Sequence, residues 1–406
     1  MCYFGYFLFF MDCDFPWINQ HITDDPARLS LRFGSQRAAD ILQIECRKRF
    51  GSKLRHTLAL NPQFIFPSAL AGEQSTSDAL AAFHASLISD GEQVADLTAG
   101  LGIDAMAIAR KAHIVAIDLD LAKVDALRIN ARLIPNLSTI CDDCRHWLQL
   151  QPASSFSTLF IDPARRAANG GRVYALSDCE PDVTAMLPEL RRVSNRLIIK
   201  ASPMLDIAHT LSLLPEAVSV IALGTTTECK ELVIICDFST AAPSEPEINA
   251  VTIASDGSVI SQIQFTKSEE LSAQIATADP LPGLWLYQPY PAVMKAAPMR
   301  LLSSRFPAQK LSPQSHIWLS SELIPDFPGH AYRVEQVIPC SSRTLKQLVN
   351  QRIKASITTS NFPMTADQLR TRLRASDGPH RLFASTDSAG SRILIFTSPF
   401  IPTPSL

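Results

Sequence analysis

Two aspartates and a loop of small residues between them are the first residues here whose types and spacing suggest chemistry. Asp96 closes an apolar run that starts at Val94, and Asp118 closes a second run that starts at Ile114. The loop between them is Thr98-Ala99-Gly100-Leu101-Gly102, which lets a ligand approach the backbone closely. A helix that follows such a loop directs its free N–H groups at electron-rich ligand atoms. With Asp118 placed to accept both hydroxyls of a ribose, the pattern predicts a nucleoside-cofactor site on a doubly wound sheet.

The same residues leave the class of cofactor open. The segment 100–105 matches the dinucleotide fingerprint G-x-G-x-x-G/A, and Asp118 follows near the distance that this fingerprint requires. S-adenosylmethionine (SAM) is favoured because Asp96 can meet a cationic amino group and because an Asp162-Pro163 pair ends a later strand. A tight turn that binds no ligand is the simplest alternative, and the two acids make it the less favourable one.

Length and composition are those of an ordinary globular protein. The 406 residues have room for two or three domains, with 46% hydrophobic and 19% charged residues. Nine cysteines, an odd number, argue against a secreted disulfide framework and predict a reducing cytoplasm. Cys141 and Cys144 are interpreted as buried thiols at a strand end, not as a metal site. The apolar start, residues 1–11, is too short to span a bilayer and lacks a signal peptide's cationic start, so we expect an N-terminal extension.

Basic residues concentrate in the C-terminal part of the chain. Residues 290–406 contain 14 Lys and Arg against 6 Asp and Glu, which leaves 23 against 33 for residues 1–289. A basic region on an acidic body suggests an anionic partner, with nucleic acid as the first candidate. Solvated helix faces would give the same composition, so the partner remains open on this ground alone.

The periodicity of apolar residues divides the chain into four regions. They are a helical N-terminal region (1–90), an α/β domain (91–240) and two small α+β domains (249–325 and 326–406), with a linker at 239–247. Strands and helices alternate in the second region, which predicts a mostly parallel sheet. A short link between strands 217–223 and 231–237 permits an antiparallel pair at its edge, an arrangement typical of methyltransferases and not of dehydrogenases.

Seven segments together indicate a known family. They are 73–77 (EQSTS), 96–104 (DLTAGLGID), 161–166 (IDPARR), 178–182 (DCEPD), 200–206 (KASPMLD), 228–232 (ECKEL) and 357–363 (ITTSNFP). With them, the chain resembles a family of bacterial class I SAM-dependent methyltransferases whose C-terminal region is ferredoxin-like and then THUMP-like. The resemblance covers most of residues 20–400. It implies a Rossmann-like methyltransferase sheet, SAM as cofactor, and a THUMP-like end that binds RNA, either tRNA or rRNA. Ala99 departs from the family, which often has glycine there, and Asp118 stands where glutamate is frequent.

Three residues are expected to act on the substrate. Methyl transfer needs a lone pair in line with the methyl group, so catalysis is mostly positioning and control of a proton. Asp162 follows the fourth strand, where its carboxylate could hold or deprotonate an amine or a ring nitrogen. Arg165 and Arg166 could clamp a phosphate or stack on a base. Equally, these arginines could pair with Asp178 or Asp182 and only hold the loop.

Further contacts are expected around these groups. We expect the cofactor to contact Asp96, Thr98, Ala99, Gly100, Gly102, Asp104, Asp118, Leu119, Asp143, Asp162 and Pro163. Of the neighbouring acids Asp142 and Asp143, the second is preferred as the acceptor of an adenine amino group. Lys200, Ser202 and Asp206 follow the fifth strand and are expected at the same rim, where substrate contact and loop structure are both open. No set of metal ligands is expected.

Two functions of other classes compete with an RNA methyltransferase. An RNA-binding protein with an inactive methyltransferase fold would not need Asp96, Gly100, Gly102 and Asp162, which are all present. A nicotinamide-dependent oxidoreductase is compatible with the glycine loop taken alone. A small-molecule or protein substrate also remains open for a methyltransferase.

Overall fold

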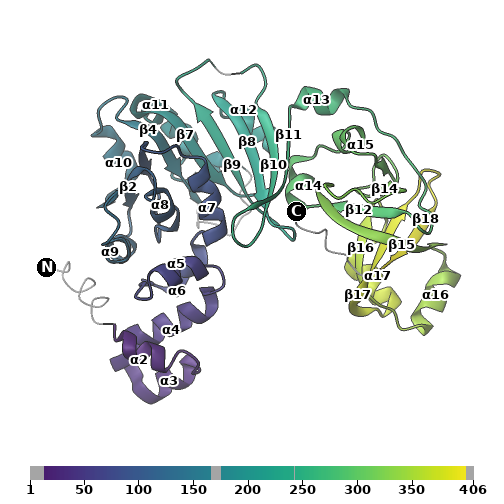
Figure 1. Cartoon of the computed structure of the whole chain (residues 1–406), viewed down its shortest axis with the longest axis horizontal. Helices are drawn as coiled ribbons and strands as arrows, with labels where there is room; N and C mark the ends of the chain where they lie inside the picture. Colours follow the sequence, from purple (N-terminus) through teal and green to yellow (C-terminus); the bar gives the residue numbers. More distant parts are fainter. Residues whose placement is uncertain (1–12, 166–174, 242, 399–406) are drawn as a thin grey trace. The chain divides into compact units, whose positions relative to one another are not determined.

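The computed structural model describes residues 13–165, 175–241 and 243–398 (Figure 1). The expectations for residues 1–11 and for Arg166 lie outside these ranges. The chain forms two compact units. The first comprises Met1–Val220, Glu231–Pro246 and Ala254–Ser258, and the second comprises Ile221–Lys230, Glu247–Ile253 and Val259–Leu406.

The first unit begins with helices, as expected for residues 1–90. They are α2 (Phe15–Gln20), α3 (Pro26–Phe33), the 3₁₀ turn η1 (Gly34–Arg37), α4 (Ala38–Phe50), α5 (Arg55–Leu60), α6 (Ala69–Gln74) and α7 (Asp78–Ser86). Helix α7 begins where the Ser77 hydroxyl accepts a hydrogen bond from the Leu80 N–H, which caps the N-terminus of the helix. Phe50, Phe64 and Phe66 form a buried cluster that includes Leu101 of the glycine loop. This packing anchors the helical region against the start of the α/β domain.

A nine-stranded sheet follows, in the order β11-β10-β8-β9-β7-β4-β1-β2-β3. Its strands are β1 (Gln93–Asp96), β2 (His113–Asp118), β3 (Leu137–Cys141), β4 (Phe156–Ile161), β7 (Ser194–Ala201), β8 (Ala217–Gly224), β9 (Cys229–Asp237), β10 (Glu247–Ile253) and β11 (Val259–Phe265). Strands β3, β2, β1, β4 and β7 are parallel, and β9 runs antiparallel to β7. The predicted mostly parallel sheet with one antiparallel strand is therefore confirmed. The antiparallel strand lies between β7 and β8, and not at an edge as the short link suggested. Strands β10 and β11 pair antiparallel at the end of this order, and their residues belong to the second unit.

The helices of the α/β domain begin at the end of the sheet where the parallel strands finish. They are α8 (Ile103–Ile108), α9 (Leu121–Asn130), α10 (Cys144–Gln149), α11 (Val183–Val193) and α12 (Ile207–Ser212). Aspartate side chains cap α9 to α12 at their N-termini, from Asp120, Asp143, Asp182 and Asp206. Helix α8 differs, because its N-cap is Gly102 and no side chain caps it. A short two-stranded ladder, β5 (Ala164–Arg165) with β6 (Cys179–Glu180), and the turn η3 (Leu176–Asp178) complete this part.

The second unit contains a seven-stranded sheet in the order β13-β14-β12-β15-β18-β17-β16. Its strands are β12 (Trp285–Pro289), β13 (Gln309–Lys310), β14 (Trp318–Ser320), β15 (Gly329–Pro339), β16 (Lys354–Ser360), β17 (Ser376–Thr386) and β18 (Arg392–Thr397). Its helices are α13 (Lys267–Ser272), α14 (Pro291–Ala296), α15 (Leu301–Arg305), α16 (Ser342–Asn350) and α17 (Ala366–Leu373). Helices α14 and α15 are separate because Ala297 adopts a left-handed φ of 63° and Pro298 follows it.

Within the described ranges, no helix combines the length and the apolar character needed to cross a bilayer.

Candidate active site

The parallel strands bring the predicted acids to one edge of the sheet. Asp96 is the last residue of β1, Asp118 is the last residue of β2, and Asp162 follows directly after β4. The carboxyl ends of parallel neighbours meet at the same edge, which is where ligands bind in such sheets. Thr98 connects two of these strand ends, since its hydroxyl oxygen accepts a hydrogen bond of 2.7 Å from the Asp162 N–H. The structure thus brings together the residues that the sequence placed in one site.

Two glycines give the loop after β1 its shape, for different reasons. Gly102 has a φ of 79°, and a Cβ atom there would lie 2.2 Å from the Leu127 side chain, so the position is closed to any larger residue. Gly100 has a φ of 56°, but a Cβ there would meet nothing closer than the Thr98 carbonyl oxygen at 4.0 Å. Gly102 therefore serves internal packing, whereas the loop at Gly100 borders open space that a ligand can enter.

Asp118 is oriented by backbone donors on both of its oxygens. The Gly100 N–H donates to Oδ2 at 2.8 Å and the Asp120 N–H donates to Oδ1 at 2.9 Å. Each carboxylate oxygen can accept a further hydrogen bond, which leaves the group able to bind two neighbouring hydroxyls. The next residue, Leu119, is 72% exposed and offers an apolar surface beside this carboxylate. This arrangement fits the ribose and base of a nucleoside.

Asp96 is a buried carboxyl group with few hydrogen bonds to offset the loss of water around it. It is 2% exposed, and its one hydrogen bond within the described residues comes from the Thr98 N–H at 3.2 Å. Burial and the nearby negative charge of Asp104 raise the pKa of Asp96 to about 8. The Lys200 charge lowers this pKa only in part, and no cation among the described residues forms a hydrogen bond or ion pair with the Asp96 carboxylate, so a positively charged ligand would favour its ionised form.

Lys200 is buried, and its ammonium group contacts three acceptors, one of which is the partly exposed Asp162. Its ammonium nitrogen is 2.7 Å from Asp162 Oδ2, 2.8 Å from Thr76 Oγ1 and 3.2 Å from Asp104 Oδ2. An ammonium group has three donors, so these three acceptors occupy all of them. Although burial alone would lower the pKa of Lys200, the carboxylates of Asp104 and Asp162 raise it well above its ordinary value. The lysine therefore carries a fixed positive charge inside the domain.

His84 continues this buried network away from the site. Its Nδ1 is 2.7 Å from Asp104 Oδ1, and its Nε2 is 2.5 Å from Glu231 Oε1. Burial opposes a charged imidazole, but the two carboxylates outweigh it and raise the pKa of His84 to about 9. Lys200 and His84 in turn lower the pKa of Asp104, against the effect of its burial. His84 is thus an imidazolium that donates to an acid on each side.

Sequence reasoning missed the role of this network. None of His84, Thr76 and Glu231 was among the residues expected at the site. A signal was present, because Thr76 and Glu231 lie in two of the segments that carried the family resemblance, 73–77 and 228–232. Asp104 was expected to contact the cofactor. The structure places its two oxygens in contact with His84, Thr76 and Lys200, and its contact with the cofactor remains a prediction.

Other predicted residues take local structural roles. Asp143 caps α10 and pairs with Arg145 at 2.6 Å, and that hydrogen bonding lowers the pKa of Asp143. Asp206 caps α12, and the Ser202 hydroxyl accepts a hydrogen bond from the Met204 N–H at 3.3 Å. Their contacts with adenine or substrate remain predictions, and so does the role of Arg165, whose backbone pairs with Cys179 in the β5–β6 ladder.

The expectation that both cysteines at the end of β3 are buried is wrong. Cys141 and Cys144 were expected to be buried together, but the Cys141 thiol is exposed and only Cys144 is buried. Cys141 is the last residue of β3, the outermost strand of the sheet, and no neighbouring strand covers it on that side. Among the described residues no cluster of His, Cys, Asp or Glu has the geometry of a metal site.

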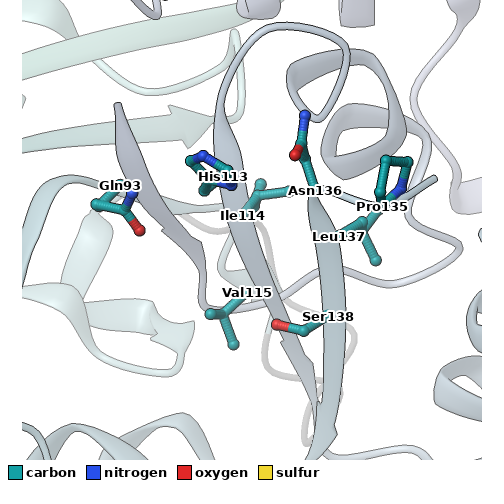
Figure 2. Close-up of a pocket in the computed structure, with 8 residues that line it drawn as sticks. All are labelled: Gln93, His113, Ile114, Val115, Pro135, Asn136, Leu137 and Ser138. Atoms are coloured by element: carbon teal, nitrogen blue, oxygen red, sulfur yellow. The ribbon is translucent and has the colours of Figure 1, made fainter. Parts of the chain in front are cut away.

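A pocket of about 300 Å³ lies at the amino ends of the parallel strands, opposite the ends that carry Asp96 and Asp118 (Figure 2). It is lined by Gln93, His113, Ile114, Val115, Pro135, Asn136, Leu137 and Ser138, which lie at or near the starts of β1, β2 and β3. Ligands of doubly wound sheets bind outside the carboxyl ends of the strands, so this pocket is not the candidate site.

The sheet order and the carboxyl-edge residues define a methyltransferase-like α/β domain followed by a separate, mainly antiparallel unit. In the second unit, a family model described as a ferredoxin-like domain matches residues 285–328, and one described as THUMP domain-like matches residues 329–399. A crystal structure of a "putative methyltransferase" from Porphyromonas gingivalis W83 is 30% identical, with a TM-score of 0.83 over 95% of this chain and 97% of that chain. The chain belongs to the family of this protein, in which a methyltransferase-like domain precedes ferredoxin-like and THUMP-like domains.

Two other solved structures overlap with smaller parts of the chain. TrmN from Thermus thermophilus is 16% identical, with a TM-score of 0.32 over 41% of this chain and 51% of that one. SMU.1697c from Streptococcus mutans, in complex with SAH, is 14% identical, with a TM-score of 0.30 over 39% and 95%. No curated protein sequence matches the chain.

Proposed function

We propose that this chain is a SAM-dependent methyltransferase that acts on RNA in the cytoplasm, with a base nitrogen of tRNA or rRNA as the acceptor. The observation that carries the proposal is the buried, weakly compensated Asp96 carboxylate beside a loop that borders open space at Gly100. Asp118, on the neighbouring strand, completes a set of donors and acceptors suited to a positively charged nucleoside.

The charge of Asp96 also favours SAM over a nicotinamide dinucleotide. A dinucleotide places its anionic pyrophosphate at the glycine loop, where it would oppose the ionisation of Asp96, whereas a cationic ligand favours the ionised form. SAM carries a cationic amino-acid end, which Asp96 would hold while Asp118 accepts the ribose hydroxyls and Leu119 packs against the base. When bound, SAM supplies a methyl group on a sulfonium centre that a nitrogen lone pair can attack.

Asp162 is the residue we assign to the acceptor. Its side chain is 46% exposed, in contrast to the buried Asp96, and the Thr98 hydroxyl fixes its backbone. The carboxylate can accept a hydrogen bond from an amino group or ring N–H, which aims the nitrogen lone pair, and it can take the proton that the methylated nitrogen releases. Arg165 and Arg166 follow in sequence and are proposed to contact the RNA backbone.

The proposal of an RNA partner depends on the composition and family match of the C-terminal region. Residues 290–406 carry the excess of basic residues, and the THUMP domain-like match covers 329–399 of them. Arg343 and Lys346 are exposed, and they stand one helical turn apart on α16. Such side chains would bind phosphates without reading sequence, and the methyltransferase-like domain would select the nucleotide.

Binding and product analysis together test the proposal. Titration calorimetry of the purified chain should show SAM binding, no NADH binding, and loss of SAM binding in Asp96→Ala and in Asp118→Ala. The exposed acid Asp90, at the other end of β1, provides the control Asp90→Ala, which should bind SAM normally. Unchanged SAM affinity in both site variants would refute the assignment.

Mass spectrometry of nucleosides from wild-type and deletion cells then addresses the substrate. One methylated nucleoside should be absent from the deletion strain and restored by the wild-type gene. If SAM binds but no RNA nucleoside changes, the alternative of an RNA-binding protein with an inactive methyltransferase fold gains support.

A further inference from the structure

The Asp162 carboxylate meets the solvent on one side and a buried cation on the other. Its Oδ2 atom lies 2.7 Å from the Lys200 ammonium. Its Oδ1 atom accepts no hydrogen bond from any residue that the structure describes. Lys200 itself is 5% exposed. A substrate at the sheet edge can therefore reach the carboxylate, but it can reach the lysine only through that carboxylate.

Lys200 cannot move without breaking a network that spans several elements. Thr76 precedes α7, Asp104 lies in the first turn of α8, and Lys200 stands near the end of β7. The Thr76 hydroxyl is 2.5 Å from Asp104 Oδ2 and 2.8 Å from the lysine nitrogen, so it bridges the two. Because α8 starts at Gly102 of the cofactor loop, the network also connects that loop with the lysine.

The charges along the network alternate. From the site inward they are Asp162, Lys200, Asp104, His84 and Glu231, with each cation between two carboxylates. A buried charge is tolerated when it is paired and hydrogen-bonded on all sides. Lys200 is the cation between Asp104 and Asp162, and its charge also favours ionisation of the nearby Asp96. The lysine thus balances the acids of β1, α8 and the β4 end.

We propose that Lys200 is a positioning residue that acts on the substrate only through Asp162, whose carboxylate it holds as a fixed acceptor at the sheet edge. This inference rests on the proposed function, and it replaces the direct substrate contact that the sequence suggested for Lys200. Thr76, Asp104, His84 and Glu231 hold the ammonium in place and do not touch the substrate. Lys200 should therefore matter for the rate of transfer and little for RNA binding.

A double-mutant cycle with Asp162 tests the inference. The variants are Lys200→Met, Asp162→Asn and the combination, with Lys111→Met, a lysine substitution beside the start of β2, as the matched control. Methyl transfer from radiolabelled SAM to RNA of a deletion strain gives kcat and KM, calorimetry gives SAM affinity, and thermal unfolding confirms that each variant is folded. Lys200→Met should lower kcat by about tenfold or more with little change in KM for RNA. In the Asp162→Asn background, the same change should cost at most about twofold.

Several results would overturn the inference. A full additional loss from Lys200→Met in the Asp162→Asn background, or a raised KM for RNA with unchanged kcat, would show that the lysine contacts the substrate directly. Unchanged kcat would show that it does not position Asp162. Should Lys200→Met fail to fold, Thr76→Val removes one acceptor of the ammonium, and it should lower kcat in the wild-type background but not beside Asp162→Asn. If the wild-type chain binds SAM and methylates no RNA, the proposed function fails first and the inference falls with it.

Discussion

His84 and Glu231 are 147 positions apart in the chain, yet the histidine Nε2 and the glutamate Oε1 lie 2.5 Å apart in the interior of the first unit. The other ring nitrogen contacts Asp104 at 2.7 Å, so the imidazole bridges α7, α8 and β9. Because α8 continues the glycine loop, this bridge ties the cofactor loop to the antiparallel strand of the sheet.

The first prediction concerns the pH dependence of this bridge. The pKa of His84 is about 9 in the folded chain against an ordinary value of 6.5. Its stabilisation is therefore fully present below pH 6.5 and is lost as the pH rises through 9. We expect His84→Asn to lower the free energy of unfolding by roughly 3–5 kcal/mol at pH 6.5, because two buried carboxylates lose their partner.

Urea unfolding at several pH values between 6 and 10 measures this difference. The gap between the wild-type chain and His84→Asn should shrink above pH 9. The exposed His56 gives the control variant His56→Asn, whose effect should be small at every pH. A gap that widens with pH would contradict a charged His84.

The second prediction is that removing the Asp96 charge stabilises the ligand-free protein. The folded-state pKa of Asp96 is about 8 against an ordinary value of 3.8, so its ionisation is disfavoured in the fold. The contribution of Asp96 to the stability of the ligand-free chain therefore falls as the pH rises from 3.8 to 8, the reverse of the usual behaviour of an aspartate. Asp96→Asn should raise the free energy of unfolding by roughly 1–3 kcal/mol at pH 7 and abolish SAM binding. A variant that is less stable than wild type at pH 8 would disprove this.

A third prediction follows for the binding reaction itself. Asp96 is mostly protonated at pH 7 without ligand, and a cationic ligand requires its ionised form. SAM binding at pH 7 should therefore release up to about one proton. Titration calorimetry in buffers of different ionisation enthalpy measures the number released. It should decrease as the pH rises above 8, and a release that is absent at pH 7 would argue against Asp96 as the partner of the cation.

The two loop glycines should respond differently to alanine. Gly102→Ala places a methyl group 2.2 Å from Leu127 and strains a φ of 79°, so we expect a loss of roughly 2–4 kcal/mol in stability. Adding Leu127→Ala should recover part of that loss. Gly100→Ala also strains a left-handed φ of 56°, but its methyl group meets open space, so it should cost less stability than Gly102→Ala while weakening SAM binding. Thermal unfolding and calorimetry separate these effects, and equal destabilisation by both alanines would count against the roles given to the glycines.

The last prediction addresses the RNA partner. Arg343→Ala combined with Lys346→Ala should weaken RNA binding and reduce the salt dependence of the affinity by about one to two ions, because each lost phosphate contact removes one released counterion. Filter binding at several salt concentrations provides the measurement. Lys267→Ala, an exposed lysine on α13 outside the two matched domains, serves as control. An identical salt slope in the double variant would exclude α16 from the interface.

Local sequence determined the strands and the loop that carry the candidate site. Each strand of the β1–α8–β2 segment is an apolar run that ends in an acid, and the loop glycines lie between the two strands. The positions of Asp96, Gly100, Gly102 and Asp118 in the fold could therefore be predicted from neighbouring residues alone. The strand ends then meet at one edge because parallel strands point the same way. Helix caps such as Ser77 were equally predictable, since a cap depends on residues three positions apart.

Tertiary structure decided the contacts that join distant segments. The sequence shows a polar residue in the apolar strand β9, but nothing near Glu231 reveals that His84 is its partner. Likewise, Lys200 was placed near the substrate by its position after β7, and only the packing of α7 and α8 behind it shows that Thr76 and Asp104 hold its ammonium. Apolar periodicity fixes which face of an element is buried, whereas the partner of a buried charge depends on which elements pack together, and that is set by the whole chain.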